Sequence, residues 1–421
     1  MFSKIKRILY FPIAYYFRFF AKIKLSRWNP QVIAITGSTG KTTTLDLVES
    51  QLGDRAFYSH HANSAYGISF NILGIKRETL QLYEWVGILF STPFKTFTSF
   101  PKQRLYVVEA DCDRPHEGKF LATLLKPNIT IWLSSSRTHS MNFDRLVKSG
   151  RFKNVEEAIA YEFGYFLKYT KDLSMINGDS ELIKGQLNRT DSQIIELNST
   201  MLKDYNVSKS GTKFEFENET FVFKSLLPEA TFMSILVSLR LCDILNVKPD
   251  KEFSEFKLPP RRSSVFKGIK NITIIDSTYN TGLAAMTAVL NMFYKIKGDN
   301  KWIVIGDILE QGENERSEHV KLANLIVTLH FNLVITLGPR IAKYGMPILQ
   351  EKYKNNVISF LSPKEVLDYL ASHLEGGEIV LFKGARFLEG VIADLLLDES
   401  DVRKLPRREK AWEMRRKKWG L

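Results

Sequence analysis

The sequence predicts an α/β protein with mostly parallel sheets, and two observations support this fold class. Short apolar runs alternate with amphipathic helical patterns from residue 32 onward, which is typical of repeated βαβ units. The first apolar run also leads directly into a glycine-rich turn and then a helical pattern, within residues 32–48. A strand, a tight turn and a helix in this order form a building unit of parallel sheets.

The apolar runs expected to form strands are Val32–Ile35, Leu105–Glu109, Ile129–Leu133, Ile272–Asp276, Trp302–Ile305, Val334–Leu337 and Ile379–Phe382. Helices are expected at Val155–Leu167, Ala230–Asn246, Ala284–Tyr294 and Glu318–Leu329. Residues 213–223 alternate apolar and polar side chains, which predicts a β-hairpin. Residues 256–262 contain two consecutive prolines and are expected to form an extended linker between two domains.

The turn after the first strand has the composition of a phosphate-binding loop, TGSTGKTTT. Glycines let backbone N–H groups approach phosphate oxygens, a lysine can reach the terminal phosphates, and a threonine hydroxyl can bind Mg²⁺. The alternative is an ordinary glycine-rich turn, which rarely carries Gly-Lys-Thr directly after a strand. We therefore expect a nucleotide with Mg²⁺ at Gly37, Ser38, Thr39, Gly40, Lys41, Thr42 and Thr43.

Other polar residues follow the ends of further strands, which is where parallel sheets bind ligands. Glu109 ends an apolar strand and suits a Mg²⁺ ligand, with a solvated or capping glutamate as the alternative. His139 follows the next strand, and its position at a neighbouring strand end favours a role in the same site. Asp276, Asp307 and Lys383 follow successive strands of the second half, a more specific pattern than any one of them alone.

The composition is that of a globular protein, with 44% hydrophobic and 25% charged residues. Cys112 and Cys242 are its two cysteines, so we expect a reducing compartment and neither a disulfide framework nor a zinc site. Residues 1–30 and 402–421 carry a formal charge of +7 each, against +13 for the whole chain, so residues 31–401 sum to −1. A neutral body excludes a nucleic-acid-binding core, which would itself be basic.

The basic ends have their own expected roles. Residues 1–30 mix Lys and Arg with aromatic residues, without an apolar run long enough to span a membrane or a signal-peptide cleavage site. They suit a helix lying on an anionic membrane surface, and a helix that packs on the body is the alternative. For residues 402–421 a solvated tail is preferred over binding to anionic lipid or a partner. The aromatic residues 82–104 are expected to form a core helix and loop rather than a second surface patch.

In their order and spacing, these motifs resemble those of the Mur ligase family from about Val32 to Leu397, and most of all the branch that adds D-alanyl-D-alanine to a UDP-muramoyl tripeptide. The motifs are TGSTGKTTT (36–44), HANSAYGIS (61–69), VVEADCDRPHEG (107–118), SSRTHS (135–140), MINGD (175–179), LPPRR (258–262), IIDSTYNTG (274–282), VIGDILEQGE (304–313) and LFKGAR (381–386). The resemblance implies a central P-loop ATPase domain with a mostly parallel sheet at residues 31–258 and a C-terminal Rossmann-like ligase domain at 259–401. The segments 1–30 and 402–421 would flank these domains.

The resemblance also implies a reaction of peptidoglycan, or cell-wall, biosynthesis. ATP phosphorylates a substrate carboxylate, and an amine attacks the acyl phosphate to give an amide, ADP and phosphate. Such chemistry depends on positioning and charge neutralisation more than on a protein nucleophile. Lys41 would neutralise the β- and γ-phosphates, and Thr42, Glu109 and His139 would hold Mg²⁺. The other implied contacts are substrate at Asn63, Ser64, Lys383 and Arg386, nucleotide at Arg262 and Asn280, and nucleotide or phosphate at Asp307.

The sequence departs from the family pattern in three places. Only 35 residues precede Thr36, too few for the family's N-terminal UDP-binding domain, so we expect a lipid-linked or otherwise altered carboxylate acceptor. The lysine that is carbamylated in related ligases is missing before Asn177, and our hypothesis is that Glu162 supplies that carboxylate directly, with a surface glutamate equally favoured. Residues 281–283 read Thr-Gly-Leu where the family usually has Ala-Asn-Pro, so contacts to the nucleotide base are expected to differ.

Two other interpretations stay open. One is a ligase of the same superfamily that acts on a poly-amino-acid or folate-type substrate. The other is a membrane-attached nucleotide-binding scaffold without turnover, against which the intact Lys41, Glu109, His139 and Lys383 argue. The expected partners are ATP, a carboxylate-bearing cell-wall precursor and an amino compound. We expect a cytoplasmic monomer, peripheral at the inner face of the membrane.

Overall fold

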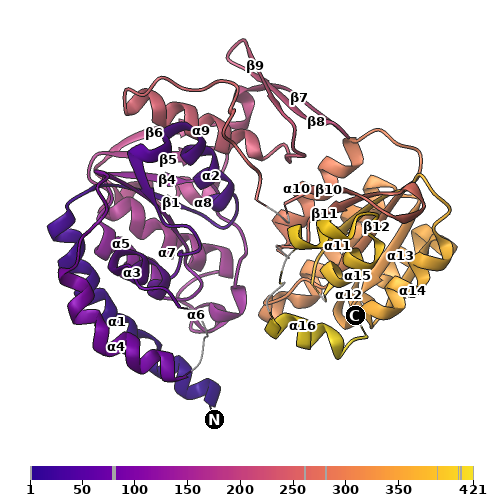
Figure 1. Ribbon diagram of the computed structural model, residues 1–421, viewed down its shortest axis with the longest axis horizontal. Coiled ribbons are helices and arrows are strands. Elements are labelled where there is room, and N and C mark those ends of the chain that lie inside the picture. The colour runs from indigo at the N-terminus through magenta and orange to yellow at the C-terminus, as the bar shows by residue number, and fades with distance from the viewer. Residues whose placement is uncertain are drawn as a thin grey trace. The chain divides into compact units, whose positions relative to one another are not determined.

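The computed structural model describes residues 2–77, 82–259, 262–279, 282–385, 387–405, 407 and 410–420. It confirms the α/β fold class, with helices and mostly parallel strands alternating along the chain. The chain divides into two compact units (Figure 1). The first comprises residues 1–136, 145–199 and 233–256, and the second comprises 137–144, 200–232 and 257–421. The change of unit after Phe256 lies beside the linker expected from the sequence.

The first unit contains a six-stranded sheet whose strands are all parallel. Its strands are β1 (Gln31–Thr36), β2 (Ala56–Tyr58), β3 (Leu105–Ala110), β4 (Ile129–Trp132), β5 (Leu173–Asn177) and β6 (Gln193–Leu197), in the order β2-β3-β1-β4-β5-β6. β1 lies between β3 and β4, and its last residue, Thr36, pairs with Ala110 and with Trp132. The carboxyl ends of these three strands therefore meet at one edge of the sheet, where the strand order diverges and ligands bind in open α/β sheets.

Helices cover this sheet. They are α1 (Phe2–Trp28), α2 (Lys41–Leu52), α3 (Ala65–Leu73), α4 (Leu82–Phe97), α5 (Glu117–Leu125), α6 (Asp144–Lys148), α7 (Val155–Tyr169), α8 (Glu181–Lys184) and α9 (Thr231–Ile244). In the described residues of both units, short 3-10 turns lie at Gly53–Arg55, Ser140–Asn142, Leu187–Arg189, Ser199–Met201, Ile269–Asn271, Gly312–Asn314, Lys354–Asn356 and Glu399–Lys404. None of the helices in the described part of the chain is long and apolar enough to cross a membrane.

The inward face of α1 packs on the first unit. Ala14, Phe17 and Ala21 are completely buried, and Phe17 belongs to one hydrophobic cluster with Phe70 of α3 and Ile88 of α4. Residues 14, 17 and 21 are spaced three and four apart, so they share one side of the helix. This side of α1 therefore agrees with the alternative expected from the sequence, a helix that packs on the body of the protein.

Polar contacts fix α1 as well. The Tyr10 hydroxyl donates to Oε1 of Glu117 at 2.8 Å, and the Arg114 guanidinium lies 3.7 Å from the centre of the Tyr10 ring. Glu117 is completely buried, and it also accepts the backbone N–H groups of Ala65 and Asp113. Burial raises the pKa of Glu117, which the hydrogen bonds and Arg114 only partly offset. This carboxyl group therefore connects α1 to the starts of α3 and α5.

Replacing Glu117 with glutamine should destabilise the first unit by about 2–4 kcal/mol, because an amide N–H₂ would face backbone N–H donors that the carboxylate now accepts. The measurement is thermal denaturation of the full chain, in which we expect the midpoint to fall by several degrees. Glu351→Gln, on the exposed surface of α13 (Met346–Tyr353), is the matched control and should leave the midpoint unchanged. Equal midpoints for the two variants would contradict this role of Glu117.

The expectation that residues 82–104 form a core helix is wrong for the outward side of α4. Phe90 and Phe94 are each 77% exposed and Phe97 is 67% exposed, whereas Ile88 and Thr92 on the opposite side are buried. The segment does form a helix, but its aromatic residues fall on both sides of it. Only one side can contact the body of the unit, so the phenylalanines of the other side stay at the surface.

The second unit contains two sheets. The strands β7 (Leu202–Ser208), β8 (Gly211–Phe216) and β9 (Glu219–Phe223) form an antiparallel sheet, and β8–β9 is the predicted hairpin. Glu217 and Asn218 form its turn with φ of 51° and 62°, as a two-residue turn with both φ values positive requires. The larger sheet has β10 (Ser264–Lys267), β11 (Thr273–Asp276), β12 (Lys301–Gly306), β13 (Leu333–Leu337), β14 (Val357–Phe360) and β15 (Ile379–Lys383), in the order β10-β11-β15-β12-β13-β14.

All pairs of this larger sheet are parallel except β10–β11, so the unit is Rossmann-like. Ile379 and Leu381 of β15 belong to one hydrophobic core, and Val380 and Phe382 belong to another. Because successive strand residues point to opposite faces, both faces of the sheet are covered. The helices of this unit are α10 (Leu283–Lys295), α11 (Glu315–Leu329), α12 (Pro339–Tyr344), α13 (Met346–Tyr353), α14 (Pro363–His373), α15 (Leu388–Leu395) and α16 (Lys410–Lys417).

The C-terminal segment is not the solvated tail that the sequence favours. Arg416 of α16 is 5% exposed and donates to the backbone oxygen of Arg407 at 2.6 Å. Both arginines pair with the completely buried Glu389 of α15, Arg407 at 3.2 Å and Arg416 at 3.9 Å. A buried carboxylate needs such partners. Two of the positive charges of the C-terminal segment are therefore paired with a carboxylate inside the second unit.

Candidate functional site

The glycine-rich loop after β1 has the backbone that phosphate binding requires. Gly37 and Gly40 have φ of 128° and 89°, a region that other residues adopt with strain. A Cβ atom on Gly37 would lie 2.8 Å from the backbone oxygen of Ser134. The loop therefore approaches the residues after β4 as closely as a backbone can, and the helix α2 begins directly after it at Lys41.

Serines that follow β4 hold this loop in place. The N–H of Ser38 donates to the Ser134 backbone oxygen at 3.1 Å, and the N–H of Thr39 donates to the Ser134 hydroxyl at 2.9 Å. The Ser38 hydroxyl donates to the backbone oxygen of Ser136 at 2.7 Å. The sequence did not predict this role for Ser134 or Ser136. Both serines follow β4, which pairs with β1. This position beside the glycine-rich loop could have indicated the role.

Lys41 lies at the centre of the site and is only 6% exposed. Its Nζ donates to the backbone oxygen of Gly37 at 2.5 Å and pairs with Oδ2 of Asp111 at 2.8 Å. Burial lowers the pKa of Lys41, but the carboxylates of Asp111, Glu109 and Asp113 outweigh burial and hold that pKa above its usual value. Lys41 is therefore a fixed positive charge beside the loop.

Asp111 is a functional residue that sequence analysis missed. It is buried, follows β3 directly, and its N–H donates to the backbone oxygen of Asn63 at 2.8 Å. Glu109 is two residues earlier, and alternate residues of an extended segment point the same way. That spacing could have indicated a second carboxylate beside the lysine.

The predicted residues of the first unit lie near one another at this sheet edge. The side-chain amide of Asn63 donates to Oε1 of Glu109 at 3.4 Å. Ser64 caps helix α3, where its hydroxyl accepts the N–H of Gly67. Thr42 and Thr43 are partly buried in the first turn of α2. The donor set fits Mg²⁺, because carboxylate and hydroxyl oxygens beside a phosphate loop are the ligands that this ion takes.

Glu162 has a structural contact. It belongs to α7, is 4% exposed, and its Oε1 accepts the backbone N–H of His116 at 2.9 Å, at the start of α5. Burial raises its pKa, and the N–H groups of the α5 start lower it by less. A carboxylate is favourable at a helix N-terminus. That contact explains the residue without a metal, and its role as a metal ligand stays a prediction.

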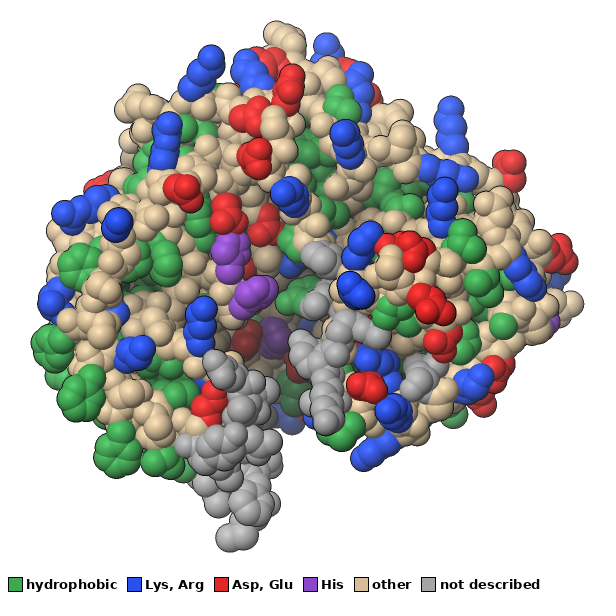
Figure 2. Space-filling model, viewed as in Figure 1, with side chains coloured by type: hydrophobic (Ala, Val, Ile, Leu, Met, Phe, Trp, Pro, Cys, Tyr) green, Lys and Arg blue, Asp and Glu red, His purple; other side chains and the backbone are tan. Residues whose placement is uncertain are grey.

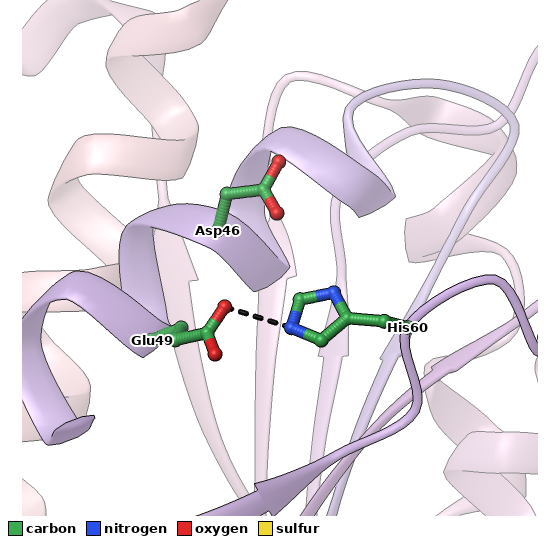
Figure 3. A group of neighbouring side chains, drawn as sticks. All are labelled: Asp46, Glu49 and His60. Carbon is green, nitrogen blue, oxygen red and sulfur yellow. Dashed lines mark ion pairs between the residues drawn. The ribbon is translucent and has the colours of Figure 1, made fainter. Parts of the chain in front are cut away.

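A second group of potential ligands lies on the outer side of α2. Figure 3 shows Asp46 and Glu49 of this helix beside His60, which follows β2. The potential ligand atoms of the three side chains lie within 4.8 Å of one another. The Nε2 of His60 pairs with Glu49 at 2.7 Å. His60 is exposed and both carboxylates are partly exposed, so an ordinary surface ion pair accounts for this group.

His139 and Asp307 lie in the second unit. His139 Nδ1 pairs with Oε2 of Glu310 at 2.6 Å, and this contact lowers the pKa of Glu310. Asp307, completely buried, accepts the backbone N–H groups of Arg340 and Ile341 at 3.1 and 3.0 Å. It therefore caps the first turn of α12.

Lys383 ends β15 and is 3% exposed. Its Nζ donates to the backbone oxygen of Ser277 at 2.9 Å. Burial first, and then the positive charge of Arg262, lower the pKa of Lys383 to about 7, against a partial offset from Asp276. Arg262 lies 5.2 Å from the centre of the Tyr279 ring. These residues bring the predicted linker arginine and the strand-end lysine together, while Asn280 and Arg386 lie outside the described residues.

Comparisons with known proteins agree with this architecture. The family described as "Mur ligase, glutamate ligase domain" matches residues 261–386. The chain is 24% identical to the UDP-N-acetylmuramoyl-tripeptide–D-alanyl-D-alanine ligase of Bacillus subtilis (strain 168), over 89% of this chain and 78% of that protein. The ligase of the same name from Rickettsia prowazekii (strain Madrid E) is 24% identical, over 90% and 80% of the two chains.

Solved structures show the same fold. The crystal structure of the MurF ligase from Thermotoga maritima in complex with ADP superposes with a TM-score of 0.72 at 20% identity, and the match covers 93% of this chain and 84% of that chain. At this identity the likeness concerns the fold.

Proposed function

We propose that this chain is an ATP-dependent carboxylate–amine ligase of the Mur type, which forms an amide bond through an acyl phosphate. The observation that carries the proposal is Lys41, buried beside a phosphate loop and held by Asp111, with Glu109 at the adjacent strand end. A fixed cation with carboxylates that can hold a metal is the arrangement that phosphoryl transfer from ATP needs.

In this mechanism the loop N–H groups and Lys41 bind the β- and γ-phosphates of ATP. Thr42 and Glu109 would hold Mg²⁺, and His139 is proposed as a further ligand of that ion. An ion held by these residues would supply positive charge beside the transferred phosphoryl group. Asn63, hydrogen-bonded to Glu109, would orient that carboxylate and contact the carboxylate substrate. Glu162 would add a further metal ligand only if its carboxylate left the start of α5.

The second unit supplies the amine side of the reaction in this proposal. Lys383 and Arg386 bind the incoming amino compound, and Arg262 and Asn280 contact the nucleotide. Asp307 positions the backbone at the start of α12, and through this backbone it would act near the phosphates. The support is the burial of Lys383 with a pKa of about 7, because a buried amine seldom persists without a function.

The substrate is a carboxylate-bearing cell-wall precursor, and the amine is D-alanyl-D-alanine or a related compound. This part rests on the names of the relatives and on the motifs that resemble theirs. We place the enzyme in the cytoplasm, where ATP is available, and propose that it acts as a monomer. Whether the precursor carries UDP or a lipid is the finer question that the experiment must answer.

The test is phosphate release by the full chain with ATP and Mg²⁺. UDP-linked muramoyl tripeptide, lipid-linked muramoyl tripeptide and a folate or polyglutamate acceptor should each be paired with D-alanyl-D-alanine and with glutamate. We expect release that requires both an acceptor and an amine. Turnover only with glutamate and a folate or polyglutamate acceptor would favour the related ligases. Nucleotide binding without release for any pair would identify a scaffold and overturn the proposal.

A further inference from the structure

The outward sides of α1 and α4 form an unusual surface, the α1/α4 face. It consists of Tyr15 and Phe19 of α1 and of Val86, Phe90, Phe94 and Phe97 of α4, all more than half exposed. Figure 2 shows hydrophobic side chains standing out at the lower left, where Figure 1 places these two helices. Exposed phenylalanines in such number mark an interaction site rather than ordinary surface.

The two helices present this face together. The Tyr16 hydroxyl donates to the backbone oxygen of Leu89 at 2.7 Å, and Lys24 donates to the backbone oxygen of Lys95 at 3.1 Å. These contacts advance along both helices in the same direction, so α1 and α4 lie side by side and parallel. The α4 residues of the face are three or four positions apart and therefore share one side of that helix.

Positive charge surrounds these aromatic side chains. The exposed cations are Lys22, Arg27, Lys95 and Lys102, and the Arg27 guanidinium lies 5.4 Å from the centre of the Phe97 ring. A shallow groove on α1 is lined by Phe19, Lys22, Ile23, Ser26 and Arg27. Residues 1–30 and 85–104 contain no Asp or Glu. The face is therefore aromatic and cationic, without acidic residues from either segment.

We propose that the α1/α4 face binds the surface of an anionic phospholipid membrane. Phenylalanine rings enter the boundary between headgroups and acyl chains, tyrosine stays at headgroup level, and lysine and arginine reach the lipid phosphates. The inward side of α1 remains packed on the protein, so the membrane is contacted from one side. This binding needs no nucleotide and goes beyond the proposed ligase reaction.

Charge favours a membrane over a second copy of the chain. A twofold interface would place the same patch on both subunits, and the cationic rims would face each other. Like charges across an interface cost free energy, and the cores of protein interfaces are depleted of charged residues. An anionic bilayer supplies the opposite charge over the whole face.

The experiment is co-sedimentation of the full chain with vesicles, without ATP. We expect binding to phosphatidylcholine vesicles that contain about 30% phosphatidylglycerol, weak binding to pure phosphatidylcholine, and loss of binding at high salt. Each basic residue near an anionic surface contributes about 1 kcal/mol, or about fivefold in affinity. The combined Lys22→Gln, Arg27→Gln and Lys95→Gln variant should therefore bind roughly 100-fold more weakly.

A second variant tests the aromatic part. Phe90→Ser, Phe94→Ser and Phe97→Ser together should weaken binding at least about tenfold, and the exposed side chains make misfolding a minor risk. The matched controls are Lys343→Gln, Lys352→Gln and Lys354→Gln for charge and Leu361→Ser for an exposed apolar residue. Ligase turnover on a UDP-linked acceptor should be unchanged in every variant, which separates this inference from the proposed function.

Three results would overturn the inference. They are equal binding to neutral and anionic vesicles, no binding to either, and controls that weaken binding as much as the variants of the face. A mass that doubles with concentration, and is reduced to one chain by the phenylalanine variant, would instead show that a second copy covers this surface.

Discussion

Replacing Lys41 with methionine should lower turnover of ATP by about 10³-fold or more. Methionine keeps the length of the side chain but removes the charge that neutralises the terminal phosphates, and loss of a single preorganised charge donor costs on this order. The measurement is kcat/KM for phosphate release with acceptor and amine at saturation. Substitution by arginine should not restore activity, because its guanidinium cannot occupy the buried position between Gly37 and Asp111.

A stability effect accompanies that change and must be separated from it. Without Lys41 the buried carboxylate of Asp111 loses its ion pair, which should destabilise the first unit by about 3–5 kcal/mol. The double variant Lys41→Met with Asp111→Asn removes both charges and should regain most of the stability. We expect it to remain inactive. Activity in this folded double variant would contradict the assigned role of Lys41.

The sequence predicted the parts of the fold that depend on local patterns. Every strand expected from an apolar run is present within two residues, because both faces of these parallel sheets are buried and their strands are continuously apolar. Some strands with mixed burial were not predicted, although the alternating pattern of the hairpin β8–β9 was. β6, for example, has three exposed residues out of five, and pairing with β5 rather than hydrophobicity makes it a strand.

Contacts between distant segments were beyond sequence analysis. Glu109 could be proposed because it ends a strand, and Lys41 because it follows the glycine-rich loop, but the Ser134 contacts of the loop depend on which strands are neighbours. The burial of Arg416 depends on Glu389, whose need for a partner no local pattern reveals. The exposed side of α4 was missed because aromatic composition alone does not say which side of a helix faces the body.

Replacing Lys383 with methionine should lower turnover at least about 100-fold while making the second unit more stable at pH 7. The residue is buried, and its pKa of about 7 lies below the usual 10.5. Keeping an amine there costs folding free energy, because the unfolded chain binds a proton that the folded chain releases. The pKa difference limits the gain in the free energy of unfolding of the variant at pH 7 to about 4 kcal/mol. Because the variant also loses the hydrogen bond to Ser277, we expect a gain of roughly 2 kcal/mol.

The pH dependence identifies the cause. Between pH 7 and 10.5 the folded state of the wild type binds fewer protons at Lys383 than the unfolded state, so its free energy of unfolding rises with pH in that window. The methionine variant lacks this rise. The difference between its free energy of unfolding and that of the wild type should therefore shrink as the pH approaches 10. Urea denaturation of both proteins at pH 7 and 9.5, with Lys352→Met as the exposed control, measures it. A variant that is less stable than the wild type at pH 7 would show that Lys383 is a structural residue, and its assignment to the amine site would then lose its physical support.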